Sequence, residues 1–273
     1  MTNETFALFS SFIESTLGIK MPPSKKIMLE TRLGKRLRAL KMNTHEEYCD
    51  YVFGKEGFQL EIQQLIDVVT TNETDFFREN KHYEFLTETV LPELLEGKRN
   101  LQINMWSVAS STGQEAYTLS MVVEEFARKQ QQSITYKILA TDISETVLNI
   151  AQTGIYTEHQ SEKIPELYKK RYCLRNKDKD QKLIRMKPEL RQKVMFRKLN
   201  LMDNTYSIHK KYHIIFCRNV FIYFDRPTQK KVLEQIYTHL APGGFLFMGH
   251  SENIGNVKLP LRSVATAVYQ NTK

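Results

Sequence analysis

The sequence predicts an α/β protein in which a mainly parallel sheet, covered by helices on both faces, follows a smaller all-helical segment. From residue 101 onward, apolar runs of strand length alternate with helix-like segments, as in strand–helix–strand units. Before residue 70, apolar residues recur at helical spacing and no strand pattern is present. Between residues 155 and 193 no long apolar run occurs, which indicates a hairpin inserted into the larger domain.

The first 70 residues predict a small helical domain. Ser24 is the expected N-cap of a helix that runs to about Met42. Its apolar stripe consists of Leu29, Leu33, Leu37 and Leu40. A second helix is expected from His45 to the glycines at 54 and 57, and a third from Leu60 to Val69.

The rest of the chain predicts the strands of one sheet and the helices between them. The expected strands are residues 101–108, 136–141, 194–199, 213–217, 245–248 and 264–269. The expected helices are residues 115–129, 144–152 and 227–240. Ligands bind to such sheets at the carboxyl ends of the strands, near a switch in strand order. Binding residues are therefore expected directly after strands.

The predicted hairpin has a turn-like tip at Asn176–Asp180, and it belongs to one of two basic stretches of a chain with net charge +8. Residues 163–198 hold fourteen basic residues and four acids, and residues 20–41 hold eight basic residues and one acid. Such patches attract nucleic acid, anionic lipid or an acidic protein surface. Either patch alone is equally consistent with a solvated surface.

Several classes of protein are disfavoured. The three cysteines, Cys49, Cys173 and Cys217, are far apart and lack zinc spacing, so neither a structural metal nor a disulfide is expected. No apolar run reaches the roughly 18 residues of a membrane span. The first residues lack the basic start and apolar run of a secretory signal. We expect a cytoplasmic protein.

Two features indicate a site for an adenosine-containing cofactor. The strand 101–108 leads into Ala109–Gly113, whose small residues let the backbone approach a ligand closely. With one glycine, this run alone is also typical of a tight strand–helix turn. Asp142 ends the next strand, where a carboxylate can accept both ribose hydroxyls, although Asp142 or Ser144 could instead cap the following helix. Because both features occur in one strand–helix–strand unit, cofactor binding is the favoured interpretation.

A polar pair, Arg218 and Asn219, follows the strand 213–217 and should face the same crevice. The aromatic residues after it are equally consistent with a core. The segment Thr70–Glu79, between the helical part and the sheet domain, has the composition of a capped linker.

Five motifs occur in order along nearly the whole chain. They are Thr71-Asn-Glu-Thr-Asp-Phe-Phe-Arg-Glu79, Trp106-Ser-Val-Ala-Ser-Ser-Thr-Gly-Gln-Glu-Ala-Tyr117, Ala140-Thr-Asp-Ile143, Phe216-Cys-Arg-Asn-Val-Phe-Ile-Tyr-Phe224 and Gly249-His-Ser-Glu-Asn253. Together they closely resemble the chemotaxis receptor methyltransferases, the CheR family. Family members commonly have Gly-Glu-Glu-Pro-Tyr where this chain has Gly113-Gln-Glu-Ala-Tyr117, which keeps Glu115.

The resemblance implies a class I S-adenosylmethionine methyltransferase domain with a Rossmann-like sheet at residues 86–273. A helical N-terminal domain would span residues 1–70, and a linker at 71–85 would contribute to the cofactor site. An antiparallel β-subdomain would be inserted at about 160–193. The implied reaction methylates glutamate side chains of bacterial chemoreceptors, giving methyl esters and S-adenosylhomocysteine without a metal.

The resemblance also assigns site residues and partners. By position, the cofactor contacts would be Asn72, Thr74, Arg78, Glu115, Asp142, Asn200, Leu201, Arg218 and Asn219. Arg78 and Tyr223 would lie nearest the transferred methyl. The partners would be the cytoplasmic methylation helices of receptors, and in some members the β-subdomain binds a receptor C-terminal tail. We expect a monomer that binds no nucleic acid.

The implied chemistry needs positioning rather than proton transfer. A glutamate carboxylate, with an unperturbed pKa of about 4.3, is already ionised at neutral pH. It must be desolvated and aligned with the sulfonium methyl, which agrees with the lack of an acid–base motif. Because receptor methylation helices are acidic, the basic residues Arg32, Lys35 and Arg38 are the expected docking face.

Two alternatives remain open at this point. A nucleic-acid methyltransferase would explain the charge, but amino-methylating enzymes usually carry Asp/Asn-Pro-Pro-Tyr/Phe where this chain has Arg218-Asn-Val-Phe221. The other alternative is a non-catalytic cofactor sensor or receptor-binding module.

Overall fold

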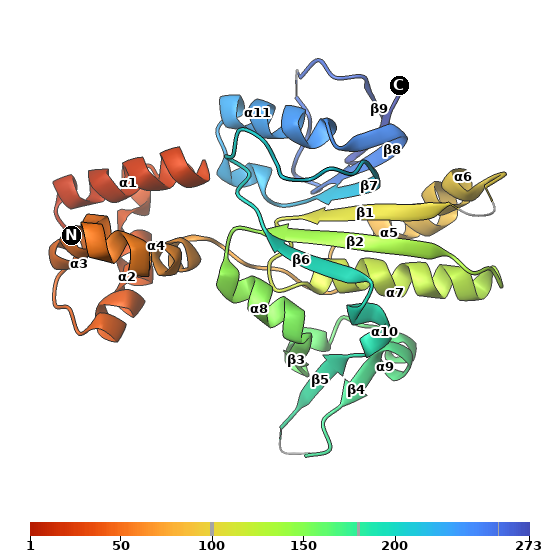
Figure 1. Cartoon of the computed structure of the whole chain (residues 1–273), viewed down its shortest axis with the longest axis horizontal. Coiled ribbons are helices and arrows are strands. Elements are labelled where there is room, and N and C mark those ends of the chain that lie inside the picture. The colour runs from red at the N-terminus through yellow and green to blue at the C-terminus, as the bar shows by residue number, and fades with distance from the viewer. Residues whose placement is uncertain (99–100, 179–180, 256) are drawn as a thin grey trace.

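The computed structural model describes residues 1–98, 101–178, 181–255 and 257–273. Figure 1 shows a group of helices at one end, a central sheet with helices on both faces, and a small second sheet beside it. This arrangement confirms the predicted α/β class with a helical N-terminal domain and an antiparallel insertion. None of the described helices is both long enough and apolar enough to cross a bilayer.

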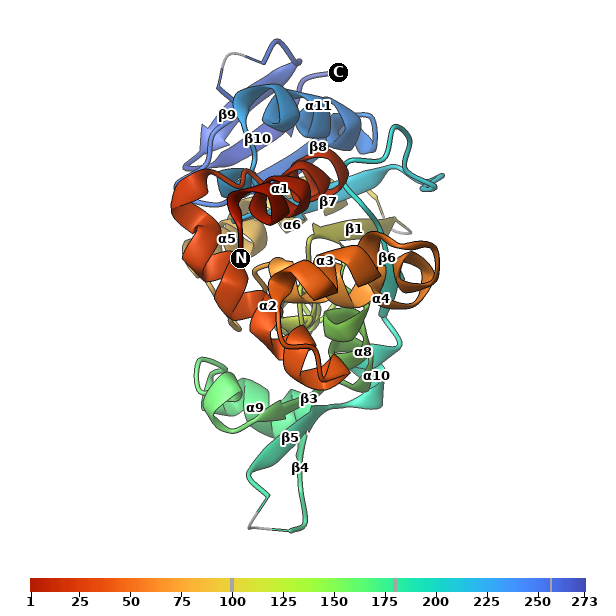
Figure 2. The same ribbon diagram turned by 90° about the vertical axis from the view of Figure 1, so that its left-hand side faces the viewer.

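The N-terminal domain is formed by α1 (Asn3–Leu17), α2 (Lys26–Leu40), α3 (His45–Phe53) and α4 (Lys55–Val69). Leu29, Leu33 and Leu37 are buried in its core, as the predicted stripe requires. Figure 2 shows these helices stacked in front of the sheet domain.

Two predicted helix limits in this domain are wrong. Ser24 is no N-cap, because it lies inside the 3-10 turn η1 (Pro23–Lys25), which a proline with its fixed backbone angle begins. Gly57 lies inside α4 rather than ending α3. A glycine is needed at position 57 for packing, because a Cβ there would lie 1.9 Å from the carbonyl oxygen of Tyr51.

Within the described residues, seven strands form the main sheet in the order β6-β2-β1-β7-β8-β10-β9. The strands are β1 (Gln102–Val108), β2 (Thr135–Asp142), β6 (Val194–Lys198), β7 (Tyr212–Cys217), β8 (Leu240–Met248), β9 (Leu261–Ala265) and β10 (Val268–Asn271). β1 pairs in parallel with β2 on one side and β7 on the other. The strand order therefore switches at β1, where a ligand crevice is expected.

The single strand predicted at residues 264–269 is in fact two strands. β9 and β10 pair antiparallel, and Ala267 between them has a φ of 55°, in the left-handed region. The apolar residues continue through the turn, so the pattern contains no glycine or proline to mark it. β10 also pairs antiparallel with β8, so β9 forms the edge of the sheet, while the strands from β6 to β8 pair in parallel.

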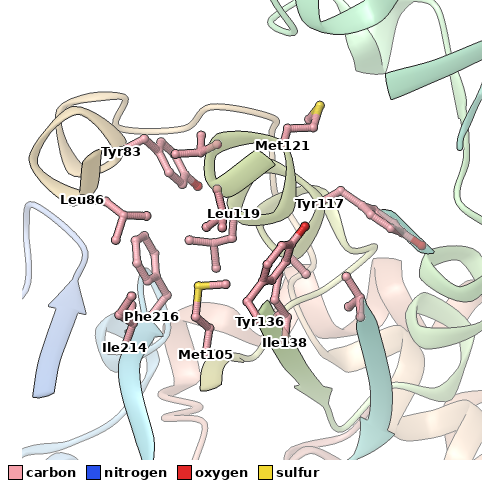
Figure 3. Close-up of a cluster of buried hydrophobic side chains, with 14 of the residues drawn as sticks. Tyr83, Leu86, Met105, Tyr117, Leu119, Met121, Tyr136, Ile138, Ile214 and Phe216 are labelled. Atoms are coloured by element: carbon pink, nitrogen blue, oxygen red, sulfur yellow. The ribbon is translucent and has the colours of Figure 1, made fainter. Parts of the chain in front are cut away.

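Helices cover both faces of the sheet (Figure 1). One face packs against α5 (Lys81–Phe85), η2 (Leu86–Val90), α6 (Leu91–Leu95) and α7 (Gln114–Lys129), and the other against α11 (Arg226–Tyr237). Successive residues of β1 alternate between these cores, with Met105 in the first and Trp106 in the second. Figure 3 shows Met105 beside Leu119, Tyr136 and Phe216 in the first core.

The small sheet has the order β3-β5-β4 and is antiparallel, as the predicted hairpin requires. Its strands are β3 (Ile155–Thr157), β4 (Cys173–Arg175) and β5 (Leu183–Met186). Of the neighbouring helices, α9 (Glu166–Tyr172) contacts β4, α8 (Glu145–Thr153) contacts β2 and β6 of the main sheet, and α10 (Pro188–Arg191) contacts α7. β3 precedes the predicted start near residue 160. Of the predicted tip, residues 179 and 180 lie outside the described residues.

A buried carboxylate joins this subdomain to α7. Glu125 is 2% exposed and accepts hydrogen bonds from Arg171 Nη1 (2.6 Å), Tyr172 Oη (2.8 Å) and Arg128 Nη2 (2.7 Å). Burial favours the neutral acid, but the bonds from Arg128, Arg171 and Tyr172 outweigh it and lower the pKa of Glu125 to about 2. The ionised carboxylate therefore stabilises the junction.

Glu125→Gln should lower the free energy of unfolding at pH 7 by about 2 kcal/mol, because the donors lose a charged acceptor. The folded-state pKa of Glu125 lies below the unfolded value of about 4.3, so this stabilisation is present above that pH and is lost as the pH falls toward 2. Urea unfolding at neutral and acidic pH measures the difference between wild type and variant. A difference that does not shrink in acid contradicts the assignment.

Candidate active site

A cleft lies at the carboxyl ends of β1, β2 and β7, beside the switch in strand order. The residues predicted to contact the cofactor or the transferred methyl all line it: Asn72, Thr74, Arg78, Glu115, Asp142, Asn200, Leu201, Arg218, Asn219 and Tyr223. They come from the linker, from the start of α7 and from the segments that follow β2, β6 and β7. The fold therefore brings every one of them to a single place.

The turn between β1 and α7 forms one wall of the cleft. Ala109 and Ser111 have φ values of 51° and 49°, an uncommon conformation for residues other than glycine. Gly113 has a φ of 92°, and a Cβ there would lie 2.8 Å from the Cβ of Ala151 on α8. The glycine is thus needed for turn geometry and helix packing, whereas Ala109, Ser110 and Ser111 line the cleft.

Asp142 is held by backbone amides at the end of β2. Its Oδ2 accepts from Ser111 N (2.8 Å) and its Oδ1 from Ser144 N (3.0 Å). Ser144 is the N-cap of α8, because its hydroxyl accepts from Val147 N (3.3 Å). Burial raises the pKa of Asp142, and the amide bonds counteract this. Each oxygen keeps acceptor capacity for a hydroxyl in the cleft.

Arg218 is the buried cation of the site, with only 6% of the residue exposed. Its Nη2 donates to Glu79 Oε2 (3.0 Å) and to the carbonyl of Arg78, and its Nη1 donates to Glu115 Oε2 (3.2 Å) and Tyr83 Oη (3.2 Å). Burial disfavours the cation, but Tyr83 and both carboxylates keep the pKa of Arg218 above its usual value. The linker, α7 and the end of β7 are thereby joined.

The two carboxylates around Arg218 differ in their electrostatics. Burial raises the pKa of Glu115, although Arg218 and the hydroxyl of Ser107 at 2.7 Å oppose this. Burial acts in the same direction on Glu79, but Arg218 outweighs it and the pKa of Glu79 is lowered. Glu79 is absent from the predicted site residues, and its place beside Arg78 in the first motif is the signal that could have found it.

The two residues predicted nearest the methyl group both line the cleft and come from different segments. Arg78 donates to the carbonyl of Glu73 (3.1 Å) and forms no ion pair within the described residues. Tyr223 belongs to the 3-10 turn η4 (Phe221–Tyr223), and its backbone oxygen accepts from Lys20 N (2.9 Å). Arg78 thus retains charge for an anionic ligand.

The N-terminal domain also contributes to the cleft, although no residue of it was predicted to do so. Leu17 and Ile19, at the end of α1, line it. Asn200 Nδ2 donates to the carbonyl of Thr16 (2.8 Å). A Cβ at Gly18 would lie 2.5 Å from the Sδ of Met202, so the two domains touch closely here. No motif marks these residues, because their role depends on how the domains dock.

The predicted docking residues do not form one free surface. Arg32 donates to the carbonyls of Val69 and Thr70 (3.3 Å for Thr70) and to Thr71 Oγ1 (2.7 Å), so its charge is used where the linker begins. Lys35 and Arg38 are exposed. Part of the hydrogen-bonding capacity of Arg32 is thus used inside the chain, and receptor docking by the three residues stays a prediction.

The polar groups of the cleft fit S-adenosylmethionine, which presents ribose hydroxyls, an ammonium group and a carboxylate. Ser110 Oγ is buried, lines the cleft and has no partner within the described residues, so it can bond a ligand. Asp142 has acceptor oxygens that suit hydroxyl groups, and Glu115 has one near the buried Arg218; contact of either residue with the cofactor stays a prediction.

One group of described residues, Glu79, His82 and His250, has ligand atoms within 4.8 Å of one another. Arg218 donates to Glu79 Oε2 at 3.0 Å, so a metal ion bound there would lie close to a guanidinium. The absence of a metal stays a prediction.

Comparison with known proteins adds a family to this geometry. The family profile described as "CheR methyltransferase, SAM binding domain" matches residues 72–269. The profile described as "CheR methyltransferase, all-alpha domain" matches residues 4–70.

Similar proteins extend over nearly the full length. A chemotaxis protein methyltransferase of Borreliella burgdorferi is 36% identical over 97% of this chain and 94% of its own length. Chemotaxis protein methyltransferase 2 of Pseudomonas aeruginosa is 36% identical over 98% of this chain and 93% of its own. The chemotaxis protein methyltransferase of Escherichia coli is 32% identical over 100% and 92%. With both profiles matched in order, this chain belongs to the CheR methyltransferase family.

Proposed function

We propose that this protein transfers the methyl group of S-adenosylmethionine to glutamate side chains on the cytoplasmic helices of bacterial chemoreceptors, giving glutamyl methyl esters and S-adenosylhomocysteine. The observation that carries the proposal is the assembly of all the family-matched residues in one cleft at the switch point of the sheet. The names of the similar proteins support the chemotactic role.

The cofactor would supply an electrophilic methyl group on a sulfonium sulfur, and the chain would hold it from several sides. Asp142, buried at the end of β2, would accept the ribose hydroxyls. Glu115 and the hydroxyl of Ser110 would bond the polar groups of the methionine part. Arg218 would act mainly by fixing Glu115, because its own donors are already engaged.

The acceptor glutamate would enter the cleft already ionised. Arg78, with no ion pair within the described part of the chain, is the cation suited to bind its carboxylate. Tyr223, which also lines the cleft, would donate its hydroxyl to a carboxylate oxygen and so orient the attacking lone pair. Binding in a fixed geometry, away from water, would supply the rate enhancement.

The surface of α2 is the proposed receptor contact. Lys35 and Arg38 are exposed there, and acidic methylation helices would be attracted to them. The β-subdomain, whose strands β4 and β5 project at the lower end of Figure 2, is a candidate site for a receptor C-terminal tail. We propose that the protein acts as a monomer in the cytoplasm, where these receptor segments lie.

The reaction is tested by incubating the protein with receptor-containing membranes and S-adenosylmethionine labelled in the methyl group. Carboxyl methyl esters are hydrolysed by base, so we expect label on the receptor that base releases as methanol. The matched control is Asp142→Asn, which keeps the size of the side chain but removes an acceptor, and should weaken S-adenosylhomocysteine binding at least about tenfold. Base-stable label on RNA or DNA, or binding without transfer, contradicts the proposal.

Tyr223→Phe should lower kcat about tenfold, because one hydrogen bond that orients the carboxylate is removed. The affinity for S-adenosylhomocysteine should stay within about twofold of wild type. Steady-state methylation and calorimetric binding measure the two quantities. Unchanged turnover refutes the role of Tyr223.

Arg32 should behave differently from its neighbours on α2. Charge reversal at Lys35 and Arg38 should raise the KM for receptor about tenfold and leave S-adenosylhomocysteine affinity unchanged. Arg32→Met should instead weaken S-adenosylhomocysteine binding, because it releases Val69–Thr71 at the start of the linker that lines the cleft. If the double reversal also weakens cofactor binding, the exposed face of α2 has a structural role.

A further inference from the structure

A buried carboxylate that no part of the proposed reaction uses lies in the loop after β8. Glu252 is 7% exposed and belongs to the fifth motif, Gly249–Asn253. We propose that Glu252 is a positioning residue, whose carboxylate fixes the conformation of the segment Arg218–Phe224. The inference rests on the proposed cofactor site, because that segment forms one wall of the cleft.

The carboxylate of Glu252 is bonded by three backbone amides. Its Oε2 accepts from Asn219 N (2.9 Å) and from Gly249 N (2.8 Å), and its Oε1 accepts from Phe221 N (2.8 Å). Within the described residues Glu252 forms no ion pair, so its carboxylate is bonded by backbone amides rather than by a cation. Such charge-assisted bonds are stronger than those between neutral groups. Two of the three donors lie on either side of Val220.

The segment held in this way supplies much of the cleft. Its lining residues are Arg218, Asn219, Val220, Ile222, Tyr223 and Phe224. The conformation needs support, because Asn219 has a φ of 59°, in the left-handed region, directly after β7. Glu252 itself does not line the cleft in the described structure. It therefore acts through the residues that its carboxylate holds.

Gly249 makes this arrangement sterically feasible. A Cβ at Gly249 would lie 2.7 Å from Asn219 Nδ2 and 3.0 Å from Asn219 N, so the loop after β8 lies directly against the loop after β7. The amide of Glu252 donates to the carbonyl of Gly249 (2.8 Å), which closes a tight turn and directs the carboxylate to the amides. Gly249 thus allows the two loops to approach closely, and Glu252 binds the backbone amides of the loop after β7.

An amide cannot replace the carboxylate. Glutamine has one acceptor oxygen, and its NH2 group would face at least one of the three backbone N–H donors. Glu252→Gln should therefore release part of the segment and reduce the preorganisation of the cleft. The loss should be seen in cofactor affinity rather than in stability alone.

The test measures S-adenosylhomocysteine binding by calorimetry and unfolding by urea for the full-length wild type and three variants. Glu252→Gln should weaken binding at least about tenfold, the factor that corresponds to one charged hydrogen bond. Gly249→Ala keeps the acid but adds a Cβ that would lie 2.7 Å from Asn219 Nδ2 and 2.9 Å from Glu252 Oε2, so it should disturb the same contact and weaken binding in the same direction. Glu125→Gln, a buried acid at the subdomain junction, should lower stability while binding stays within about twofold.

Unchanged binding in Glu252→Gln overturns the inference, as does an equal loss in Glu125→Gln, which would make the effect one of general stability. If Glu252→Gln does not fold, Gly249→Ala decides: normal binding by that variant overturns the inference. If the wild type itself does not bind S-adenosylhomocysteine, the proposed cofactor site fails and the positioning role fails with it. Normal wild-type binding with insensitive variants refutes the positioning role alone.

Discussion

The site depends on one buried ion-pair network, in which Arg218 lies between Glu79 and Glu115. A guanidinium removed from water is costly unless its donors are bonded and its charge is balanced. The members of the network come from three separate segments: Glu79 from the linker, Glu115 from the first turn of α7, and Arg218 from the end of β7. The charge can be satisfied only when all three are in place. The network therefore couples the position of the linker to those of α7 and the end of β7.

Other buried carboxylates connect parts of the chain in a similar way. Glu61 joins α4 to α2 through Arg36 and also accepts from Tyr48. Glu125 joins α7 to the inserted subdomain. Glu252 joins the loop after β8 to the loop after β7. In each case an acid on one segment binds donors on another, so the acid specifies a relative position that apolar packing alone leaves less defined.

The positions of the cleft residues follow partly from the sequence. The strand–helix alternation predicts where strands end, and the residues directly after them, Asp142 and Arg218, do face the crevice. The linker residues were assigned to the cleft only through the family resemblance, because their spacing shows no helix or strand periodicity. Leu17 and Ile19 were not predicted, because they reach the cleft only through domain docking. The bond of Arg32 to the carbonyl of Val69 was not predicted for the same reason: the two residues are 37 positions apart, and a basic helix face does not reveal internal bonds.

The sequence by itself determined the fold class and most of the order of helices and strands, and it predicted the place of the cleft, because apolar periodicity and the residues at strand ends are local properties of the chain. The tertiary structure decided which polar side chains have partners. In it, Arg32 bonds the start of the linker, Arg218 pairs with two carboxylates, and Glu252 accepts from three backbone amides. The physical reason is that burial and hydrogen bonding depend on contacts between segments distant in sequence. These contacts determine whether a charged side chain is already paired or can bind a ligand.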